Sequence, residues 1–231
     1  MNEVKNIIDW KKLLKDAASG DATLQYEVGN YFDHGLEINH QTVVEQNPSE
    51  AFKWYEKAYS NGHIEAGTRL ADFYSEGKFC SKNITLAKKL YNKGIENGSS
   101  IAAHNLAVLY CDLGDFSMSF ELYKTAQKLD KTNLIELAYC YYFGIGTDKD
   151  KKKALEIFQK IAGDTSENRN CAFEIEDANY FIGLYFLEGV IVEKSIENAR
   201  MCFERANIDN DHRSANEMLL MIGKPREINL G

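Results

Sequence analysis

The sequence is poor in several features that mark other classes of protein. Only two of its 231 residues are proline, and no stretch approaches 18 consecutive apolar residues, so no segment has the length of a membrane-spanning helix. Its 27 lysines and arginines are outnumbered by 35 aspartates and glutamates, which gives a net charge of −8. Because phosphate groups are bound by basic surfaces, this balance argues against nucleic acid and anionic membranes as partners. The first twelve residues carry charges every few positions and no apolar run of the kind a secretory signal needs, so we expect a cytoplasmic protein.

Cysteine and histidine are too few and too irregularly placed for a disulfide framework or a metal site. The five cysteines are an odd number and none forms a Cys-x-x-Cys pair, so we expect reduced, mostly packed thiols and no zinc. The cysteines are Cys80, Cys111, Cys140, Cys171 and Cys202. The five histidines have no metal-ligand spacing, and Gly144-Ile145-Gly146 lacks the third glycine and the lysine of phosphate-binding loops. We therefore expect no metal and no cofactor.

What the sequence does contain is a short phrase that recurs five times. An aliphatic residue is followed at once by a small residue and four positions later by an aromatic residue, and in four copies glycine stands seven positions later. The aliphatic residues are Val28, Leu70, Leu106, Leu137 and Ile182. The small residues after them are Gly29, Ala71, Ala107, Ala138 and Gly183. Glycine at the end of the phrase predicts a left-handed residue that ends a helix.

A second phrase follows each copy of the first. It has a small residue, an apolar residue three positions on, an aromatic residue four positions on, and a small or aliphatic residue seven positions on. The small residues of the second phrase are Ala51, Ala87, Ser119, Ala154 and Ala199. Offsets of three, four and seven place residues on one face of an α-helix, so each pair of phrases predicts a pair of helices.

The spacing of the phrases locates the loops and the ends of the array. Extra residues between phrases predict loop insertions at Leu36 to Pro48 and around Gly163 to Cys171. We predict an all-α fold, an α/α solenoid of about five helix pairs that forms a single domain over residues 1–231. The expected segments are an N-terminal capping helix (1–20), repeats at 21–62, 63–98, 99–131, 132–171 and 172–211, and a C-terminal capping helix with a tail (212–231).

Two stretches carry the pattern of a known family. Residues 70–77 read Leu-Ala-x-x-Tyr-x-x-Gly, and residues 144–150 read Gly-x-Gly-x-x-x-Asp. They resemble the Sel-one-like repeat, a relative of the tetratricopeptide repeat, whereas the third unit is four residues shorter and resembles an ordinary tetratricopeptide unit. The resemblance implies a right-handed superhelix whose first helices line a concave groove, and a scaffold that binds other proteins rather than an enzyme.

The tetratricopeptide groove positions lie two residues before the aliphatic position and two, five and six after it. Carried onto this sequence, they give eight polar or acidic residues in the first two repeats: Tyr26, Asn30, Asp33, His34, Thr68, Asp72, Ser75 and Glu76. The third repeat contributes His104, Val108, Cys111 and Asp112. The last two repeats contribute a mainly aromatic and apolar set: Ile135, Tyr139, Tyr142, Phe143, Tyr180, Leu184, Leu187 and Glu188.

These positions predict a cytoplasmic protein-protein interaction module that binds a protein partner in its concave groove. Exposed aromatic residues are typical binding anchors, and the carboxylates around them favour a partner that is basic or presents a basic and apolar segment. Two narrower alternatives stay open: a bacterial immunity protein that neutralises a cognate toxin, and a hydrolase of the β-lactam type. The second is disfavoured because such family members carry paired cysteines that this chain lacks. The insertion at 163–171 could instead cover the groove and bury the rear aromatic residues.

Overall fold

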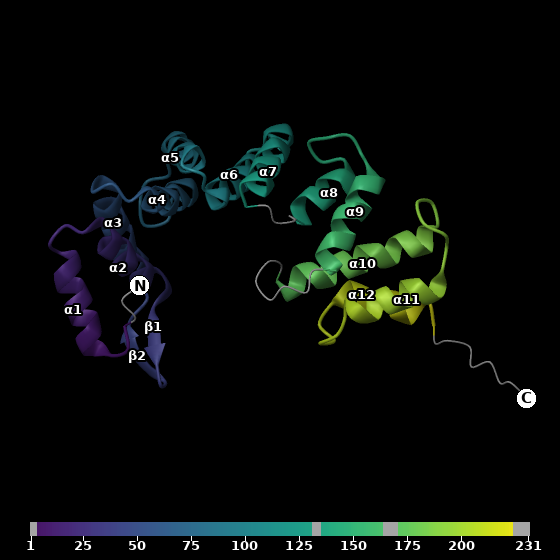
Figure 1. Ribbon diagram of the computed structural model, residues 1–231, viewed down its shortest axis with the longest axis horizontal. Coiled ribbons are helices and arrows are strands. Elements are labelled where there is room, and N and C mark those ends of the chain that lie inside the picture. Colours follow the sequence, from purple (N-terminus) through teal and green to yellow (C-terminus); the bar gives the residue numbers. More distant parts are fainter. Residues whose placement is uncertain (1–3, 131–134, 164–170, 224–231) are drawn as a thin grey trace, which may run out of the picture. The chain divides into compact units, whose positions relative to one another are not determined.

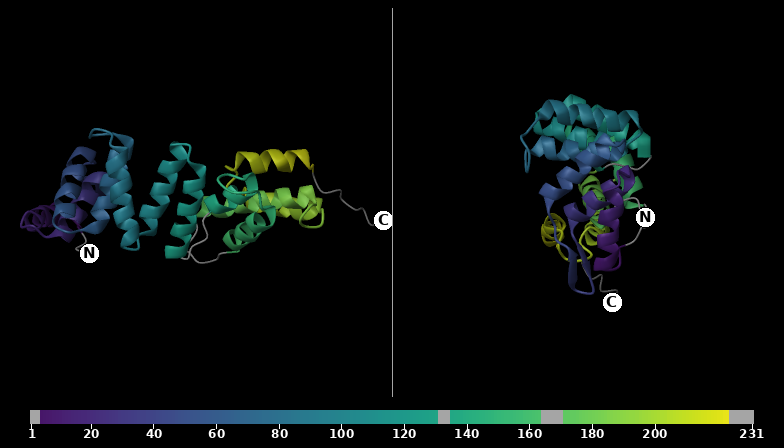
Figure 2. Two further views of the ribbon diagram at one scale, coloured as in Figure 1. Left: turned by 90° about the horizontal axis from the view of Figure 1, so that it is seen from above. Right: turned by 90° about the vertical axis from the view of Figure 1, so that its left-hand side faces the viewer.

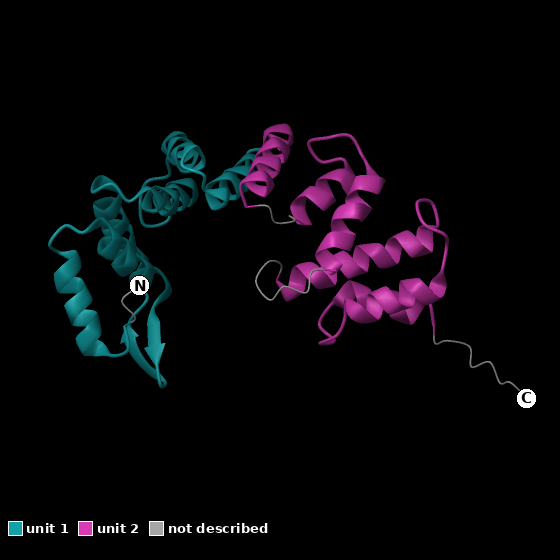
Figure 3. Ribbon diagram, in the orientation of Figure 1, with its two compact units in different colours: residues 1–113 teal, residues 114–231 magenta. Residues whose placement is uncertain are grey.

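The computed structural model describes residues 4–130, 135–163 and 171–223, and most of these residues lie in helices (Figure 1). The chain divides into two compact units, Met1–Leu113 and Gly114–Gly231, which we call unit 1 and unit 2 (Figure 3). Each unit is described by itself. The repeat boundaries and the single continuous domain remain predictions.

From residue 4 onward, unit 1 contains six helices and one β-hairpin, with successive helices packed against each other. The elements are α1 (Ile7–Ala17), α2 (Ala22–His34), β1 (Leu36–Ile38), β2 (Gln41–Val44), α3 (Pro48–Ser60), α4 (Ile64–Glu76), α5 (Ile84–Glu96) and α6 (Ser100–Asp112). The predicted N-terminal capping helix is α1, whose Trp10 and Leu13 are buried in a cluster with Val28 of α2 and Val44 of β2.

The described residues of unit 2 form six helices, seen from two further directions in Figure 2. They are α7 (Phe116–Asp130), α8 (Ile135–Phe143), α9 (Lys151–Ala162), α10 (Ala172–Glu188), α11 (Ile196–Arg205) and α12 (Arg213–Met221). The predicted C-terminal capping helix is α12, whose buried Ala215 packs with Ala199 and Phe203 of α11.

The pattern of buried residues confirms the helical stripes. The aliphatic position of the first phrase is buried in all five copies, and so is the aromatic position of the second phrase. Those aromatic residues are Tyr55, Tyr91, Tyr123, Phe158 and Phe203. The small residue after the aliphatic position lets the partner helix approach: a Cβ atom added at Gly29 would lie 2.6 Å from Cε1 of Tyr55, and one at Gly183 would lie 2.5 Å from Cε1 of Phe203.

Glycine ends the first helices as predicted. Gly35, Gly77, Gly144 and Gly189 have φ angles of 73°, 74°, 76° and 67°. At Gly77 and Gly189 the backbone N–H donates to the carbonyl four residues earlier, which closes the last turn of α4 and α10.

The first insertion is not the irregular loop that the spacing suggested. Within Leu36 to Pro48, β1 and β2 pair antiparallel, and Asn39 and His40 make the turn with φ angles of 50° and 62°. Such left-handed pairs fit two-residue hairpin turns, and asparagine adopts this conformation more readily than most residues. Val44 of β2 is buried in the cluster with residues of α1 and α2, which attaches the hairpin to these helices.

Candidate protein-binding surface

The loop inside each repeat brings the start of the second helix beside the end of the first. In four repeats the N-cap residue of the second helix donates its backbone N–H to the carbonyl of the aromatic residue in the first phrase. The bonds are Asn47 to Phe32 (2.6 Å), Asn83 to Tyr74 (2.8 Å), Asp150 to Tyr141 (2.9 Å) and Ser195 to Phe186 (3.0 Å). Corresponding positions of different repeats can therefore be compared directly.

In the first repeat, two predicted groove residues serve the internal structure. The hydroxyl of buried Tyr55 donates to Oδ1 of Asn30 at 2.8 Å and to Oδ2 of Asp33 at 3.1 Å. Burial, together with the charge of Asp33, raises the pKa of Tyr55 well above its ordinary value. The phenol therefore stays protonated and acts as the donor that fixes both side chains.

Asp72 of α4 is held in the same way. Its Oδ1 accepts hydrogen bonds from the hydroxyl of Tyr91 at 2.5 Å and from Nδ2 of Asn105 at 2.9 Å. Burial raises the pKa of Asp72, and these two hydrogen bonds oppose part of that increase. Asp72 thus ties α4 to α5 and α6, a role that helical periodicity does not predict.

This carboxylate gives unit 1 a pH-dependent contribution to stability. Because the pKa of Asp72 is raised on folding, the native state favours the protonated carboxyl. The contribution of Asp72 to the stability of unit 1 is therefore lost as the pH rises through its native-state pKa. Asp72→Asn keeps an acceptor oxygen but carries no charge. We subtract the free energy of unfolding of the unsubstituted chain from that of the Asp72→Asn chain. This difference should increase between pH 3 and pH 7 in urea denaturation experiments. A difference that stays constant over this range would contradict the effect of burial.

The predicted residues of the second and third repeats meet at one surface pocket of unit 1. The pocket has a volume of about 500 Å³ and lies among α4, α5 and α6, so we call it the α4–α6 pocket. Five predicted groove residues line it: Asp72, Ser75, Glu76, Val108 and Asp112. The remaining lining residues were not predicted: Lys82, Ile84, Tyr91, Asn105, Leu109 and Leu113. Lys82 lies in the loop before α5, Ile84 and Tyr91 belong to α5, Asn105 and Leu109 belong to α6, and Leu113 follows α6. The predicted groove positions were taken from first helices alone.

A second, smaller pocket of unit 1 adjoins the first and shares Asp72 and Glu76 with it. This α2–α4 pocket has a volume of about 260 Å³ and is also lined by Asp33, Pro48, Arg69, Phe73, Lys78 and Phe79. Phe79 is 61% exposed and has a φ angle of 62°, an uncommon conformation for a bulky side chain. An exposed aromatic side chain thus stands at the edge of a pocket that contains carboxylates.

The other predicted residues of unit 1 lie in different surroundings. Thr68 is buried, contrary to the expectation, because it faces Gly94 of α5 rather than solvent. Tyr26 stacks on His63 with ring centroids 4.2 Å apart. His34 is exposed, and its Nδ1 lies 2.9 Å from the carbonyl oxygen of Asn30. His104 and Cys111 are partly buried on α6.

In unit 2 the predicted aromatic residues pack around Phe181 of α10, a residue that was not itself predicted. Ile135 is buried, again contrary to the expectation, because it belongs to the core formed by α8, α9 and α10. The ring of Tyr139 lies 5.3 Å from that of Phe181, and the ring of Tyr142 lies 5.0 Å from it, between centroids. Phe143 keeps 49% of its surface exposed. The other predicted aromatic residues of unit 2, Tyr139, Tyr142 and Tyr180, are partly buried. Phe143 is therefore the best placed of the four to contact a partner.

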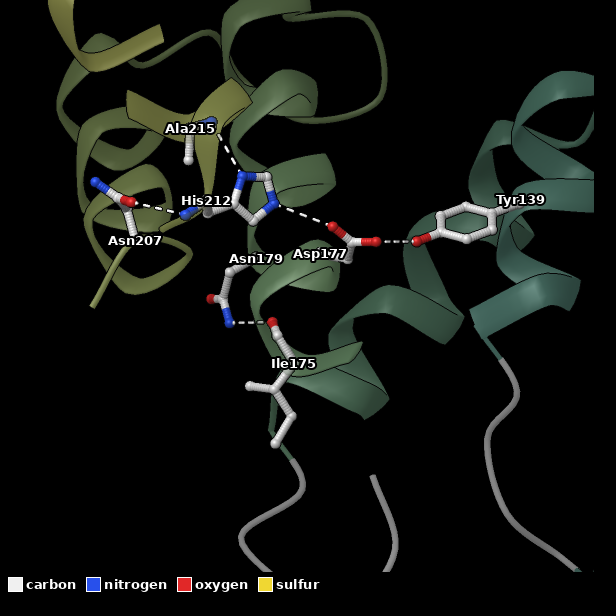
Figure 4. A network of polar contacts seen from close by, with 7 residues as sticks. All are labelled: Tyr139, Ile175, Asp177, Asn179, Asn207, His212 and Ala215. Atoms are coloured by element: carbon white, nitrogen blue, oxygen red, sulfur yellow. Dashed lines mark hydrogen bonds and ion pairs between the residues drawn. The ribbon is translucent and has the colours of Figure 1, made fainter. Parts of the chain in front are cut away.

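Tyr139 also belongs to a polar network that links three helices of unit 2. Figure 4 shows Asp177 of α10 between Tyr139 and His212: Oδ2 of Asp177 accepts from the Tyr139 hydroxyl at 2.5 Å, and Oδ1 lies 3.0 Å from Nε2 of His212. Nδ1 of His212 accepts the backbone N–H of Ala215 at 3.1 Å and so caps α12. In the neutral ring, Nε2 therefore carries the proton that is donated to Asp177. The network fixes the last helix to the core and contains no activated nucleophile.

The remaining predicted residues lie on α10. Tyr180, Leu184 and Leu187 are partly buried against the cluster formed with α11 and α12, whereas Glu188 is exposed and pairs with Lys151. The insertion that could cover the aromatic residues lies at 163–171, and its residues 164–170 fall outside the described part of the chain. Self-burial by this segment therefore remains a hypothesis.

Two further observations concern the chemistry of the described ranges. Within residues 4–130, 135–163 and 171–223, no group of three or more histidine, cysteine, aspartate or glutamate side chains is arranged to hold a metal ion. Across the same ranges, no helix combines the length and apolar character needed to cross a membrane. All five cysteines are free thiols; Cys140 and Cys202 are buried, and Cys171 is exposed.

Comparison with known families agrees with the helix-pair architecture. The model of the Sel1 repeat matches residues 22–63, 64–99, 134–163 and 176–209, which together make up more than half of the chain. The chain belongs to the Sel1 repeat family. The third unit, which resembles an ordinary tetratricopeptide unit, lies between the second and third matched segments. Sel1 repeat proteins generally mediate protein-protein interactions.

Individual relatives share the repeat at low sequence identity. Human protein sel-1 homolog 2 is 26% identical in an alignment 141 residues long, which covers 57% of this chain and 20% of that protein. The chain thus spans about a fifth of the length of this curated relative. The crystal structure of a Sel1 repeat protein from Oxalobacter formigenes has a TM-score of 0.69 and 22% identity, and the alignment covers 93% of this Sel1 repeat chain and 83% of that one.

A third relative is c5321, a protective antigen of uropathogenic Escherichia coli strains that displays the same repeat fold. It has a TM-score of 0.59 and 19% identity over 94% of this chain and 52% of that one. At such identities the two structures establish the fold alone. They confirm the predicted all-α solenoid class for this Sel1 repeat chain.

Proposed function

We propose that this Sel1 repeat chain is a cytoplasmic protein-binding module whose partner docks on unit 1, at the α4–α6 pocket and the adjoining α2–α4 pocket. The observation that carries the proposal is that predicted groove residues from two successive repeats line one open pocket of about 500 Å³. Solvent-accessible apolar side chains accompany the carboxylates there: Val108 and Leu113 line the larger pocket, and Phe79 lines the smaller one.

The character of the pockets favours a protein partner over a small molecule. Small-molecule sites are mostly apolar cavities with a few convergent polar groups that bury most of the ligand. Here charged side chains such as Glu76, Asp112 and Lys82 stand around apolar ones on the surface of the helices. An apolar centre with a charged rim is the usual composition of a protein interface. The general role of the Sel1 repeat family in protein-protein interaction supports the same reading.

The choice of variant for a test follows from the contacts in the two units. Tyr139 is unsuitable because its replacement would break the hydrogen bond to Asp177 and disturb the core of unit 2. Val108 is better because it is 40% exposed on α6 and lines the α4–α6 pocket. Ile101 offers a matched control on the same helix, since it is 59% exposed and does not line the pocket.

We expect Val108→Glu to weaken partner binding at least about tenfold, because a carboxylate would be buried among carboxylates at the interface. Ile101→Glu should leave binding within about twofold, since charges at the edge or outside of an interface contribute little. Proteins captured from lysate by the three chains can be compared quantitatively, and the affinity of the partner that distinguishes them then measured by calorimetry. Circular dichroism checks that all three chains are equally helical. Equal affinity of the Val108→Glu chain for every captured protein would contradict the assignment of this surface.

A further inference from the structure

Unit 2 contains a site in which the chain binds one of its own lysine side chains. Lys151 is the first residue of α9, and its Nζ lies 2.9 Å and 2.6 Å from the two carboxylate oxygens of Glu188 at the end of α10. The same Nζ lies 5.0 Å from the ring centroid of Tyr142. The ammonium group is therefore held by a carboxylate and an aromatic face, which are the usual partners of a lysine cation.

The repeat places Ile84 of unit 1 at the position that corresponds to Lys151. Lys151 stands three residues before Ala154, and Ile84 stands three residues before Ala87, the small residue of the same phrase. Each is the first residue of its helix. The preceding N-cap residues donate equivalent backbone hydrogen bonds, of 2.9 Å from Asp150 and 2.8 Å from Asn83, to the first helix of the repeat.

The partners of Lys151 also have counterparts in unit 1. Tyr142 stands five residues after its aliphatic position, as Ser75 does in the second repeat. Glu188 stands six residues after its aliphatic position, as Asp112 does in the third repeat. Ser75 and Asp112 line the α4–α6 pocket together with Ile84. Unit 1 thus keeps the carboxylate of the lysine site but replaces the lysine by isoleucine, and a pocket of about 500 Å³ lies there.

The electrostatics of this pocket favour a cation. Asp112 has no ion pair among the described residues, and it is the last residue of α6, a helix with no basic residue in its last turn. The C-terminal end of a helix carries partial negative charge, so a carboxylate there adds to a field that attracts cations. Three carboxylates, Asp72, Glu76 and Asp112, line the pocket together with Lys82. Glu76 pairs with Lys78, and Asp72 accepts hydrogen bonds within unit 1, so Asp112 is the carboxylate that is left for a further cation.

We propose that the α4–α6 pocket binds a lysine or arginine side chain of the protein partner. The cationic group lies at Asp112, and the aliphatic stem packs on Ile84, Val108 and Leu109, as long basic side chains do on mixed surfaces. This proposal rests on the proposed function and specifies the chemistry of the partner. The α2–α4 pocket is the weaker candidate, because Lys78 already pairs with Glu76 at 3.0 Å and Arg69 adds a second cation.

The test uses random 12-residue peptides displayed on phage and selected on the immobilised full chain. We expect selected peptides to be enriched in lysine or arginine. Replacing the critical lysine by norleucine, which keeps the stem and removes the charge, or the critical arginine by citrulline, should weaken binding at least about tenfold in fluorescence anisotropy, as is typical for loss of one partner of a close charge pair.

Variants of the chain identify the pocket. Ile84→Lys would supply the pocket with an internal lysine, as Lys151 does in unit 2, and should weaken binding of the basic peptides at least about tenfold. Asp112→Asn removes the carboxylate and should have a similar effect, whereas Ile84→Leu, the matched control, should stay within about twofold. Circular dichroism confirms that each variant is folded.

The outcomes separate this proposal from the function on which it rests. Selected peptides without basic residues, or basic peptides that bind the Ile84→Lys and Asp112→Asn chains as tightly as the unsubstituted chain, would overturn the lysine pocket and leave protein binding intact. Failure to select any peptide would count against both the lysine pocket and the proposed protein binding. If Val108→Glu then still reduces partner capture, protein binding at this surface is supported and the lysine pocket is not.

Discussion

Phe158→Ala is expected to lower the free energy of unfolding of unit 2 by about 3–5 kcal/mol, the usual cost of truncating a fully buried phenylalanine. Phe158 has no exposed surface and lies in the core shared by α8, α9 and α10. Its ring stacks on that of Phe181, with centroids 4.8 Å apart and planes 3° apart. The cavity would also remove support from Tyr139 and Tyr142, whose rings pack on the same pair.

Guanidinium denaturation of the full chain, followed by circular dichroism, measures this loss. Phe173→Ala is the matched control, because Phe173 is 65% exposed in the first turn of α10. Phe173→Ala should lower the free energy of unfolding by less than about 1 kcal/mol, as most surface substitutions do. Similar losses for the two variants would show that Phe158 is not part of a close-packed core.

The repeat made the packing of this chain predictable from sequence. A period that recurs five times identifies the residues that face the partner helix, and the aromatic residues at those positions, Tyr55 and Phe203 among them, are fully buried. Small residues at fixed offsets identify where helices approach closely, as at Gly29. These features depend on local geometry alone, since each helix presents the same stripe to its neighbours.

The polar contacts were not predictable in the same way. Periodicity shows which face of a helix a residue occupies, but it does not show whether a partner reaches that residue from a distant part of the chain. Asp72 occupies a predicted groove position, yet its side chain accepts hydrogen bonds from Tyr91 and Asn105. Tyr139 also occupies such a position, yet its hydroxyl donates a hydrogen bond to Asp177. Five of the predicted positions line a pocket in unit 1, whereas most of those in unit 2 are partly or fully buried, and their role in binding stays a prediction.

The α4–α6 pocket illustrates a signal that the sequence does contain. The first residues of the five second helices are Pro48, Ile84, Phe116, Lys151 and Ile196, so lysine occurs at this position once. The change from lysine to isoleucine is visible in the sequence, but its meaning depends on the ion pair between Lys151 and Glu188, which only the three-dimensional structure provides. Positions that correspond in a repeat can therefore differ in what they bind.

The same principle applies to the backbone, where Gly146 and Phe79 occupy corresponding positions. Gly146 stands two residues after Gly144 with a φ angle of 69°, and Phe79 stands two residues after Gly77 with a φ angle of 62°. A Cβ atom added at Gly146 would lie 2.0 Å from the carbonyl oxygen of Phe116, so glycine is required there by close approach as well as by φ. Phe79 has the same backbone conformation, but its side chain is largely exposed at the edge of the α2–α4 pocket.

Gly146→Ala should therefore destabilise unit 2 by about 2–5 kcal/mol, the sum of about 1–2 kcal/mol for a left-handed alanine and about 1–3 kcal/mol for overpacking against α7. Phe79→Gly is the matched variant, and we expect its free energy of unfolding to change by less than about 1 kcal/mol, because relief of the left-handed conformation offsets the greater freedom of glycine in the unfolded chain. Guanidinium denaturation of both chains provides the comparison. A loss below about 1 kcal/mol for Gly146→Ala would show that this loop can move away from α7.

If Phe79→Gly keeps its stability but loses partner affinity, the strained phenylalanine is retained for binding, since a residue that costs conformational energy without packing in the core needs another reason to be there.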